Sequence, residues 1–294
     1  MGATAGGVFD RRPELLDRLR QGPGAAAQQE VMTTAEAPAP SRWTLRTIRV
    51  SFDWLKEYTL SGVWYLLRRY QLQLRSAQVQ LWSPDPEYAS KYARLLACLQ
   101  TTAQQPESHA LVFWDQMGYY RWPTPTRTWA LAAPDAAPMA QRAGGNNQQW
   151  RIIAALNGLT GQVHYLDNYI VGRQQVIAMY GRLVAAYPGC QRIYVAQDNW
   201  SIHRHPDVLE ALKGWPQLEP VWLPTYAPWL NPIEKLWRWL RQDVLKMHRL
   251  ATDWPECRRR VNAFLDQFAQ GSTELLRYVG LLGEGKLAQA LAQI

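Results

Sequence analysis

The sequence predicts an α/β fold, a mixed sheet flanked by helices, with a small helical region in front of it. From about residue 108 onward, short apolar runs bounded by turn residues alternate with stretches of helical periodicity, which is the pattern of an α/β sheet. Before residue 108 the periodicity is helical throughout. At 294 residues the chain is long enough for one larger and one smaller domain.

The helical region is predicted in three parts. Residues 1–42 form an N-terminal arm and linker, in which RRPELLDRLRQG could make one short helix before a stretch rich in Ala, Gly, Pro and Gln. Residues 43–82 contain two helices separated by a tight break, with Thr44 and Ser61 as N-caps. Residues 83–107 follow as a turn and a connecting helix.

The second helix of residues 43–82 has two unlike faces. Its apolar face carries Val63, Leu66, Leu67 and Tyr70. Its other face carries Tyr65, Arg68 and Arg69. This is the pattern of a helix-turn-helix recognition helix that presents a basic aromatic face to DNA. An ordinary pair of packed helices with a solvated basic face has the same pattern, so these residues leave both interpretations open.

The α/β domain is expected over residues 108–250, followed by a helical tail over 251–294. Strands are predicted at 109–122, 127–134, 192–199 and 219–224, together with a hairpin at 151–169. Helices are predicted at 170–188, 205–215 and 231–247, and in the tail at 255–270 and 273–294. Two Gly-containing pairs, Asn157-Gly158 and Thr160-Gly161, supply the turn chemistry of the hairpin.

Charge and cysteine content narrow the class of protein. The net charge of +8 favours an anionic partner such as nucleic acid. Three cysteines, Cys98, Cys190 and Cys257, lie far apart without metal-ligand spacing, which indicates unpaired thiols in a reducing compartment. The first residues lack the apolar core of a signal peptide, and no apolar run approaches the roughly 20 residues that cross a bilayer. We therefore expect a cytoplasmic, nucleoid-associated protein and no membrane partner.

Two aspartates stand where predicted strands end. The apolar run LVFW leads directly into Asp115, and the run IYVA leads through Gln197 to Asp198. Ligands of open α/β sheets gather at the carboxyl ends of strands, so the two aspartates are candidates for one shared site. Either one alone could instead be a turn or cap residue.

Glu234 is the third candidate acid. In NPIE, Asn231 to Glu234, the order of residues predicts a capping box with Asn231 as the N-cap and Glu234 at N3. Glu234 could also pair with Arg238 one turn later. The same helix carries Arg238 and Arg241 on its other faces, so an acid in this basic setting also suits a site beside a phosphate backbone.

Three carboxylates of this kind point to phosphodiester chemistry. Two divalent cations roughly 3.5–4 Å apart can activate an attacking hydroxyl and stabilise the leaving oxygen. Hard cations such as Mg²⁺ prefer a few carboxylate oxygens together with water and phosphate. Histidines and cysteines at the spacing of a zinc site are absent from the sequence.

The sequence resembles the IS630 family of transposases, within the IS630/Tc1/mariner superfamily. QDNWSIHRHPDVLEAL and VWLPTYAPWLNPIEKLWRWL carry most of the resemblance, and SPDPEYA and LNGLTGQVHYLDN add to it. In the sequence, 35 residues separate Asp198 from Glu234, which also agrees with that family. The resemblance implies an RNase H-like DDE catalytic domain in which Asp115, Asp198 and Glu234 are the catalytic metal ligands. In this interpretation Glu234 is a metal ligand, and its place in the capping box of the helix orients its carboxylate.

The same resemblance implies a DNA transposase that uses Mg²⁺, with Mn²⁺ as a substitute. It would hydrolyse phosphodiesters at the ends of its element and join the freed 3′ hydroxyl to target DNA, typically at TA. Its partners would be double-stranded DNA, as terminal inverted repeats and target, and a second copy in a homodimer or synaptic oligomer. The side chains assigned to DNA are Tyr65, Arg68, Arg69, Arg238 and Arg241. Asn199 and His203 are assigned to support of the site, although a structural hydrogen bond would equally explain His203.

Two features leave alternatives open. Family members commonly have Asp-Glu at the first catalytic position, where this chain has Asp115-Gln116. Only about 40 residues precede Trp43, where the family usually has a further helix-turn-helix, so the chain could be truncated or one half of a split reading frame. The alternatives are a DNA-binding protein that has lost transposition and an RNase H-like nuclease acting on RNA–DNA hybrids. In the loop before Glu234, Tyr226 and Trp229 could contact DNA bases or pack against the sheet edge.

Overall fold

The computed structural model describes residues 11–21, 42–75, 82–132, 136–285 and 287–289. The chain divides between residues 79 and 80 into two compact units. The stretch from 22 to 41, predicted as a linker, lies outside the described residues.

The first unit is a small helical domain with its own core. Its elements are α1 (Arg12–Gln21), α3 (Leu45–Ser51), a 3₁₀ turn (Asp53–Leu55) and α4 (Leu60–Arg69). Apolar side chains from all of them form one cluster: Leu15, Ile48, Phe52, Leu55, Val63, Leu66 and Tyr70. Leu15, from the segment assigned to the arm, is fully buried, so α1 is part of this unit.

The N-caps of α3 and α4 test the predicted helix starts. Thr44 caps α3 as expected, because its hydroxyl accepts a hydrogen bond from the Thr47 amide at 3.1 Å. Ser61 was the wrong choice for α4. Its cap is Thr59, whose hydroxyl accepts from the Gly62 amide at 3.0 Å. Ser61 and Gly62 follow Leu60, the first residue of α4, so Thr59, two positions before Ser61, is the N-cap.

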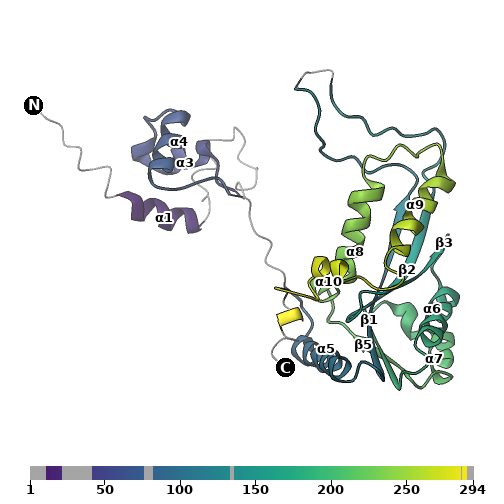
Figure 1. Cartoon of the computed structure of the whole chain (residues 1–294). Helices are drawn as coiled ribbons and strands as arrows, with labels where there is room; N and C mark the ends of the chain where they lie inside the picture. Colours follow the sequence, from purple (N-terminus) through teal and green to yellow (C-terminus); the bar gives the residue numbers. More distant parts are fainter. Residues whose placement is uncertain (1–10, 22–41, 76–81, 133–135, 286, 290–294) are drawn as a thin grey trace, which may run out of the picture. The chain divides into compact units, whose positions relative to one another are not determined.

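The second unit is built on a five-stranded mixed sheet (Figure 1). Its strands are β1 (His109–Tyr120), β2 (Gln149–Asn157), β3 (Val163–Asn168), β4 (Arg192–Gln197) and β5 (Leu218–Trp222). Their spatial order is β3-β2-β1-β4-β5, with β1, β2 and β3 antiparallel and with β4 and β5 parallel to β1. The predicted mixed sheet, with an antiparallel hairpin followed by parallel strands, is confirmed.

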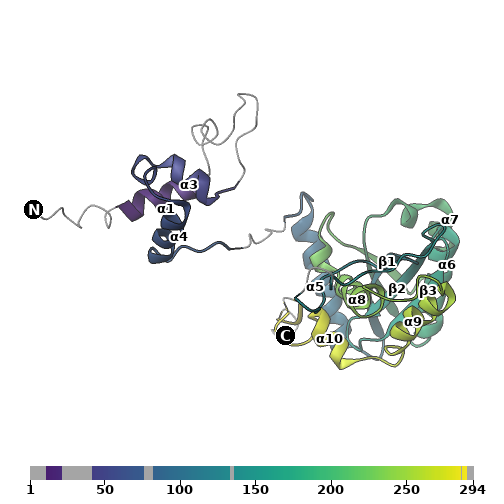
Figure 2. The ribbon, with the colours of Figure 1, turned by 90° about the horizontal axis from the view of Figure 1, so that it is seen from above.

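Helices cover both faces of the sheet (Figures 1 and 2). On one face lie α6 (Arg173–Ala186) and α7 (Pro206–Lys213), which pack on Ala110, Val112 and other side chains of even-numbered β1 positions. On the other face lie α5 (Tyr88–Gln104), α8 (Ile233–Leu240), α9 (Trp254–Asp266) and α10 (Thr273–Val279), which pack on Leu111, Phe113 and further odd-numbered positions. Successive side chains of β1 point to opposite faces of the sheet and therefore contribute to two separate hydrophobic cores.

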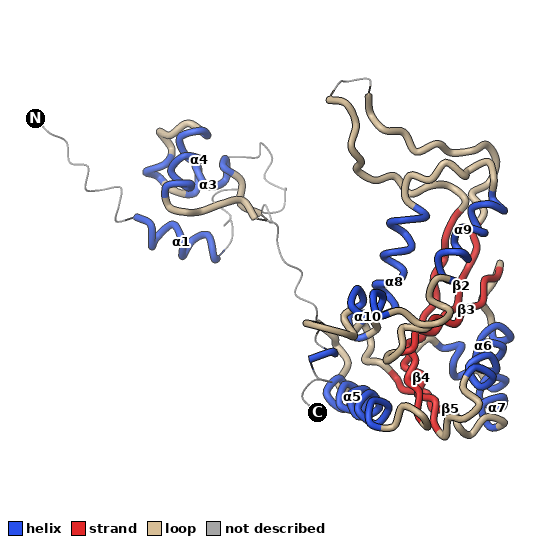
Figure 3. The backbone as a smooth tube through the Cα atoms, in the orientation of Figure 1, coloured by secondary structure: helices blue, strands red, loops and turns tan. Residues whose placement is uncertain are grey.

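The predicted strand at 127–134 is wrong over its described residues. Residues 127–132 lie in the long loop between β1 and β2, which extends away from the sheet (Figure 3), and 133–134 are outside the described residues. The fully exposed Trp129 shows that this segment has no core to join. Residues 127–132 pair with no strand of the sheet, whose order is β3-β2-β1-β4-β5.

Two other predicted helices change at their ends. The helix expected at 231–247 is α8 followed without a break by a π-helical turn, Arg241–Leu245. The last tail helix, expected to continue past residue 280, ends at Val279, because Gly280 adopts a left-handed conformation with φ +83°. The residues that the structure describes include no helix long and apolar enough to cross a membrane.

Candidate active site

The two aspartates reach the same edge of the sheet from neighbouring parallel strands. Asp115 lies in β1, and Asp198 directly follows Gln197, the last residue of β4. Asp115 has the same parity along β1 as Leu111 and Phe113, so it faces the side of the sheet that α8 covers. The predicted convergence of these strand ends is what the pairing of β1 with β4 produces.

Glu234 enters from the first turn of α8, but the predicted capping box is wrong. The side-chain amide of Asn231 does not cap the helix; it donates a hydrogen bond to the backbone oxygen of Trp114 at 3.0 Å. The backbone N–H of Asn231 donates to Pro228 at 3.0 Å rather than to the carboxylate of Glu234. Asn231 is buried, and a buried amide is stabilised more by a cross-chain acceptor than by a local one. Glu234 therefore takes no part in capping the helix.

The three carboxylates act on one another electrostatically. The pKa of Asp115 is raised to about 7, mainly by burial and then by the charge of Glu234, with a smaller contribution from Asp198; hydrogen bonds from Gln116 and Trp237 act in the opposite direction. Burial also raises the pKa of Glu234, while Arg241 and Arg238 lower it and Asp198 raises it. The three acids therefore lie near enough for their charges to influence the pKa values of Asp115 and Glu234.

Trp237 holds Asp115, a contact that the sequence reasoning missed. Its indole Nε1 donates to Asp115 Oδ2 at 2.8 Å, and its side chain is almost completely buried. Trp237 stands three residues after Glu234 on α8, so both project from one face of the helix. That spacing is the only signal in the sequence, and it says nothing about a partner 122 positions away.

The buried side chain of His203 lies next to Asp198. Its Nε2 is 3.7 Å from Asp198 Oδ1, and the ring is buried among Trp114, Trp200 and Trp222, each in an edge-on contact. Burial lowers the pKa of His203 to about 4, against an opposing effect of Asp198. The histidine is therefore neutral near pH 7 and faces Asp198 as a polar, uncharged neighbour.

Asn199 stabilises the loop next to the acids. Its side-chain amide donates to Leu223 O at 3.0 Å and contacts Thr225 Oγ1 at 3.2 Å, so it holds the loop after β5. Arg204 donates to Asn199 Oδ1 at 3.3 Å. Asn199 thus fixes the loop that borders the acids rather than adding a ligand to them.

The side chains assigned to DNA are exposed in both units. In the first unit, Tyr65, Arg68 and Arg69 all lie on the exposed face of α4, opposite the buried Val63 and Leu66, as predicted. In the second, Arg238 and Arg241 are exposed on α8 and the π turn.

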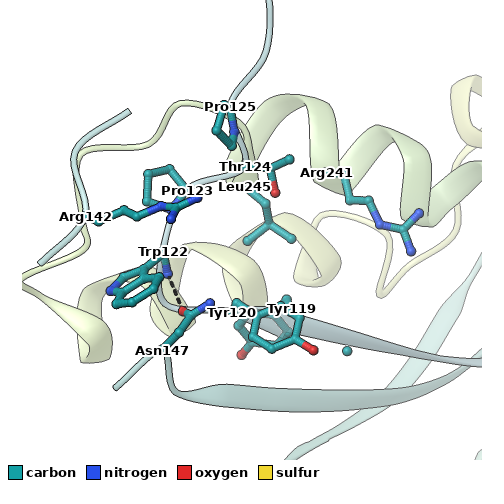
Figure 4. Close-up of a pocket in the computed structure, with 11 residues that line it drawn as sticks. Tyr119, Tyr120, Trp122, Pro123, Thr124, Pro125, Arg142, Asn147, Arg241 and Leu245 are labelled. Atoms are coloured by element: carbon teal, nitrogen blue, oxygen red, sulfur yellow. Dashed lines mark hydrogen bonds between the residues drawn. The ribbon is translucent and has the colours of Figure 1, made fainter. Parts of the chain in front are cut away.

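A cavity of about 350 Å³ lies at the end of β1, between the loop that follows β1 and the π turn, and none of the three acids lines it (Figure 4). Arg241 and Arg142 line it from different segments, and the guanidinium of Arg142 stands over the ring of Trp122. The amide of Trp122 donates to Asn147 Oδ1 at 3.0 Å across the base of the long loop. Arg241 lines this cavity and also lowers the pKa of Glu234, so its positive charge acts on both.

The donor set of the site suits a hard divalent cation. All three side chains are carboxylates, they come from three separate elements, and they repel one another. Carboxylate oxygens that leave positions for water and phosphate are what Mg²⁺ and Mn²⁺ prefer. Within the described ranges, however, no group of three or more His, Cys, Asp or Glu side chains lies close enough together to hold a metal ion.

Known proteins resemble this chain in sequence and in fold. A family model described as DDE superfamily endonuclease matches residues 110–255, which include all three acids. The insertion element IS630 uncharacterized 39 kDa protein of Shigella sonnei is 23% identical over 210 residues, 66% of this chain and 59% of that protein. A pre-cleavage Mos1 transpososome has a TM-score of 0.64 at 14% identity, covering 100% of this chain and 81% of that one.

Over residues 110–255 the chain is similar to DDE superfamily endonucleases, and its fold is similar to that of the Mos1 transposase. A Mos1 mariner paired-end complex with Mg is a further neighbour, with a TM-score of 0.56 at 15% identity over 95% of this chain and 85% of that one. These neighbours confirm the expected RNase H-like fold. The chain spans about 59% of the length of the IS630 relative that it matches.

Proposed function

We propose that this chain is a metal-dependent DDE transposase that cuts DNA at the ends of its element and joins them to target DNA. The observation that carries the proposal is the convergence of Asp115, Asp198 and Glu234, three mutually repelling carboxylates at one sheet edge. The superfamily match over the same residues supports it. Complexes of the Mos1 neighbours with transposon ends, Mg and Mn support DNA and a divalent cation as partners.

Asp115, Asp198 and Glu234 would hold two Mg²⁺ or Mn²⁺ ions. When bound, the ions activate the attacking oxygen and stabilise the leaving oxygen of a phosphodiester. Trp237 orients the carboxylate of Asp115 through its indole N–H. The exposed Arg238 and Arg241 attract the phosphate backbone beside Glu234.

The remaining parts of the proposal concern the partners. Tyr65, Arg68 and Arg69 on α4 would meet DNA, with residues 43–82 as a helix-turn-helix region. Target joining at TA and a homodimer or synaptic oligomer on DNA follow from family membership and from the need to join two ends. The chain would act on the chromosome in the bacterial cytoplasm.

The first test is cleavage of a labelled duplex that contains the inverted repeat bracketing the coding region. Wild type, Asp198→Asn and Glu234→Gln are compared with Mg²⁺, with Mn²⁺ and with EDTA. We expect metal-dependent nicking by wild type only, and DNA binding within about threefold of wild type for both variants, because their exposed cations are unchanged. Since Glu234 makes no cap, Glu234→Gln should also melt close to wild type.

Two results would speak against the proposal. Tight DNA binding without nicking by wild type would favour a DNA-binding protein without transposition activity. Cleavage that survives both substitutions would place the chemistry elsewhere in the chain.

A further inference from the structure

The loop that follows β5 contains a turn with a residue in an unfavourable conformation. The turn runs from Pro224 to Ala227 and is closed by a hydrogen bond from the Ala227 amide to Pro224 O at 3.2 Å. Tyr226 is its third residue and has φ +54°. Positive φ at this position of a turn favours Gly or Asn, because a β-carbon crowds the backbone there. A bulky aromatic residue at this place is strained.

Tyr226 differs from the other strained residues in the described part of the chain. Positive φ occurs there at two further non-glycine residues, Gln71 and Met247. Gln71 directly follows the C-cap of α4, and Met247 directly follows the C-cap of the π turn. Left-handed residues are the normal way for a helix to end. Tyr226 ends no helix, so its strain needs another explanation.

The turn is held rigidly from two sides through Thr225. On one side, the amide of Thr225 donates to Asp85 Oδ2 at 2.8 Å, and Ser83 Oγ donates to Thr225 O at 2.5 Å. The side chain of Asp85 is almost completely buried and is paired with Lys91 at 2.9 Å. On the other side, Asn199, the neighbour of Asp198, contacts Thr225 Oγ1. The SPDPEYA motif thus has a role: it anchors this turn.

No packing compensates for the strain at Tyr226. Its side chain is 76% exposed, and no hydrogen bond to its hydroxyl is found among the described residues. Its loop neighbours behave differently. Ala227 and Leu230 are buried, and Trp229 is half-buried with its Nε1 3.3 Å from the hydroxyl of Tyr88. Backbone strain that no contact in the free protein compensates often occurs where a ligand binds.

We propose that Tyr226 stacks on a DNA base next to the phosphodiester that the acids cleave, an inference that rests on the proposed function. The turn follows β5, whose parallel neighbour β4 leads into Asp198, and Asn199 ties the turn to that strand end. The backbone at Tyr226 is therefore held next to the strand end that leads into Asp198, while the Tyr226 side chain is open to solvent. Exposed aromatic rings bind bases of any sequence by stacking, which suits a site that must position DNA rather than read it.

The test compares three substitutions in the full chain. Tyr226→Gly and Tyr226→Asn both remove the ring and both tolerate positive φ, so neither should lower the melting temperature. Tyr226→Phe keeps the ring and removes only the hydroxyl. The DNA is the duplex with the inverted repeat, with 2-aminopurine in place of single bases on either side of the cleavage position.

We expect the Gly and Asn variants to nick the duplex at subsaturating DNA roughly 5- to 150-fold more slowly, the range that one lost stacking contact gives. The Phe variant should stay within about twofold of wild type. The 2-aminopurine signal at one flanking position should change on binding of wild type and Phe, and change less with Gly and Asn.

Several results would overturn the inference. Nicking by the Gly variant at the wild-type rate would refute the contact and leave the proposed function standing. A Phe variant as slow as the Gly variant would show that the hydroxyl, not the ring, matters. A Gly variant with altered mass in light scattering would assign Tyr226 to contact with another protein copy. Wild type that does not nick would refute the proposed function, and the stacking inference with it.

Discussion

The hydrogen bond between Trp237 and Asp115 can be tested by replacing Trp237 with Phe. The substitution removes the indole N–H that donates to Asp115 Oδ2 at 2.8 Å and keeps an aromatic ring in the core. Two effects should follow from the structure. The fold loses a hydrogen bond to a charged acceptor, and the carboxylate loses the group that orients it.

The first effect is on stability. A hydrogen bond to a charged group contributes about 1.5–3 kcal/mol. The side chain of Trp237 is 1% exposed, so the smaller ring also leaves a cavity. We expect the free energy of unfolding to fall by about 2–4 kcal/mol, measured by urea denaturation.

The second effect is on the cation. Loss of a group that orients a metal ligand typically costs 10- to 100-fold in metal affinity or activity. The Mg²⁺ concentration for half-maximal nicking should therefore rise by about 10- to 100-fold in Trp237→Phe. Mn²⁺ binding followed by calorimetry gives the same comparison without turnover.

Trp239→Phe is the matched control. Trp239 lies on the same helix, and its Nε1 donates to Asp243 Oδ2 at 2.7 Å, away from the acids. It packs against Phe264 and Phe268, so its replacement also costs stability. Metal dependence should be unchanged in this variant. If Trp237→Phe folds and shows the same half-maximal Mg²⁺ as Trp239→Phe, the assignment of Asp115 as an oriented metal ligand is refuted.

Three further substitutions test the architecture. Asn231→Ala removes the donor to Trp114 O, which leaves a buried carbonyl one partner short, and should lower the free energy of unfolding by about 1–3 kcal/mol in urea. Gly161→Ala should destabilise by more than about 1 kcal/mol, measured as a lower melting temperature, because φ is +71° and the new β-carbon would lie 2.4 Å from Ser272 O. Burial lowers the pKa of His164, with a smaller effect of Arg182, so the unfolded chain binds more protons below about pH 6.5 and stability falls there. The melting temperature of His164→Gln should therefore fall less steeply than that of wild type as the pH drops below 6.5.

Each of these has a result that would contradict it. An Asn231→Ala protein as stable as wild type would show that the cross-chain bond is not needed to seat α8. For the glycine, Gly144→Ala is the control, because no atom lies within 4 Å of a β-carbon built there, and equal losses at both sites would refute the steric argument. Parallel pH curves for wild type and His164→Gln would show that His164 is not the group that titrates.

Local patterns were sufficient for most of the second unit. β1 and β4 each contain an apolar run that is buried in the structure, and such a run is visible without a structure. The segment at 127–134 shows the limit of local propensity. Residues 127–132 have the composition of a strand, but they pair with no strand of the sheet, and a strand exists only with a partner.

The acids show the same difference between what neighbouring residues predict and what only the tertiary structure shows. Asp115 and Asp198 follow apolar runs, so their positions at strand ends could be predicted from neighbouring residues. The orientation of Asp115 could not, since it depends on Trp237, 122 residues later. Asn231 matched a cap motif, yet its side chain bonds to Trp114, 117 residues earlier, because a buried amide takes the partner that packing provides.

The sequence by itself determined the order and type of most elements, the basic charge and the family resemblance, and it indicated the three acids, since each of these depends on short stretches of residues. The tertiary structure alone decided how β1 is enclosed, what orients Asp115, what anchors the turn at Thr225 and why Tyr226 is strained and exposed. These features depend on contacts between segments that are distant in the sequence, such as Asp85 with Thr225, 140 residues apart. Periodicity and capping patterns describe only neighbours along the chain, whereas contacts of this kind follow from how the sheet brings distant segments together.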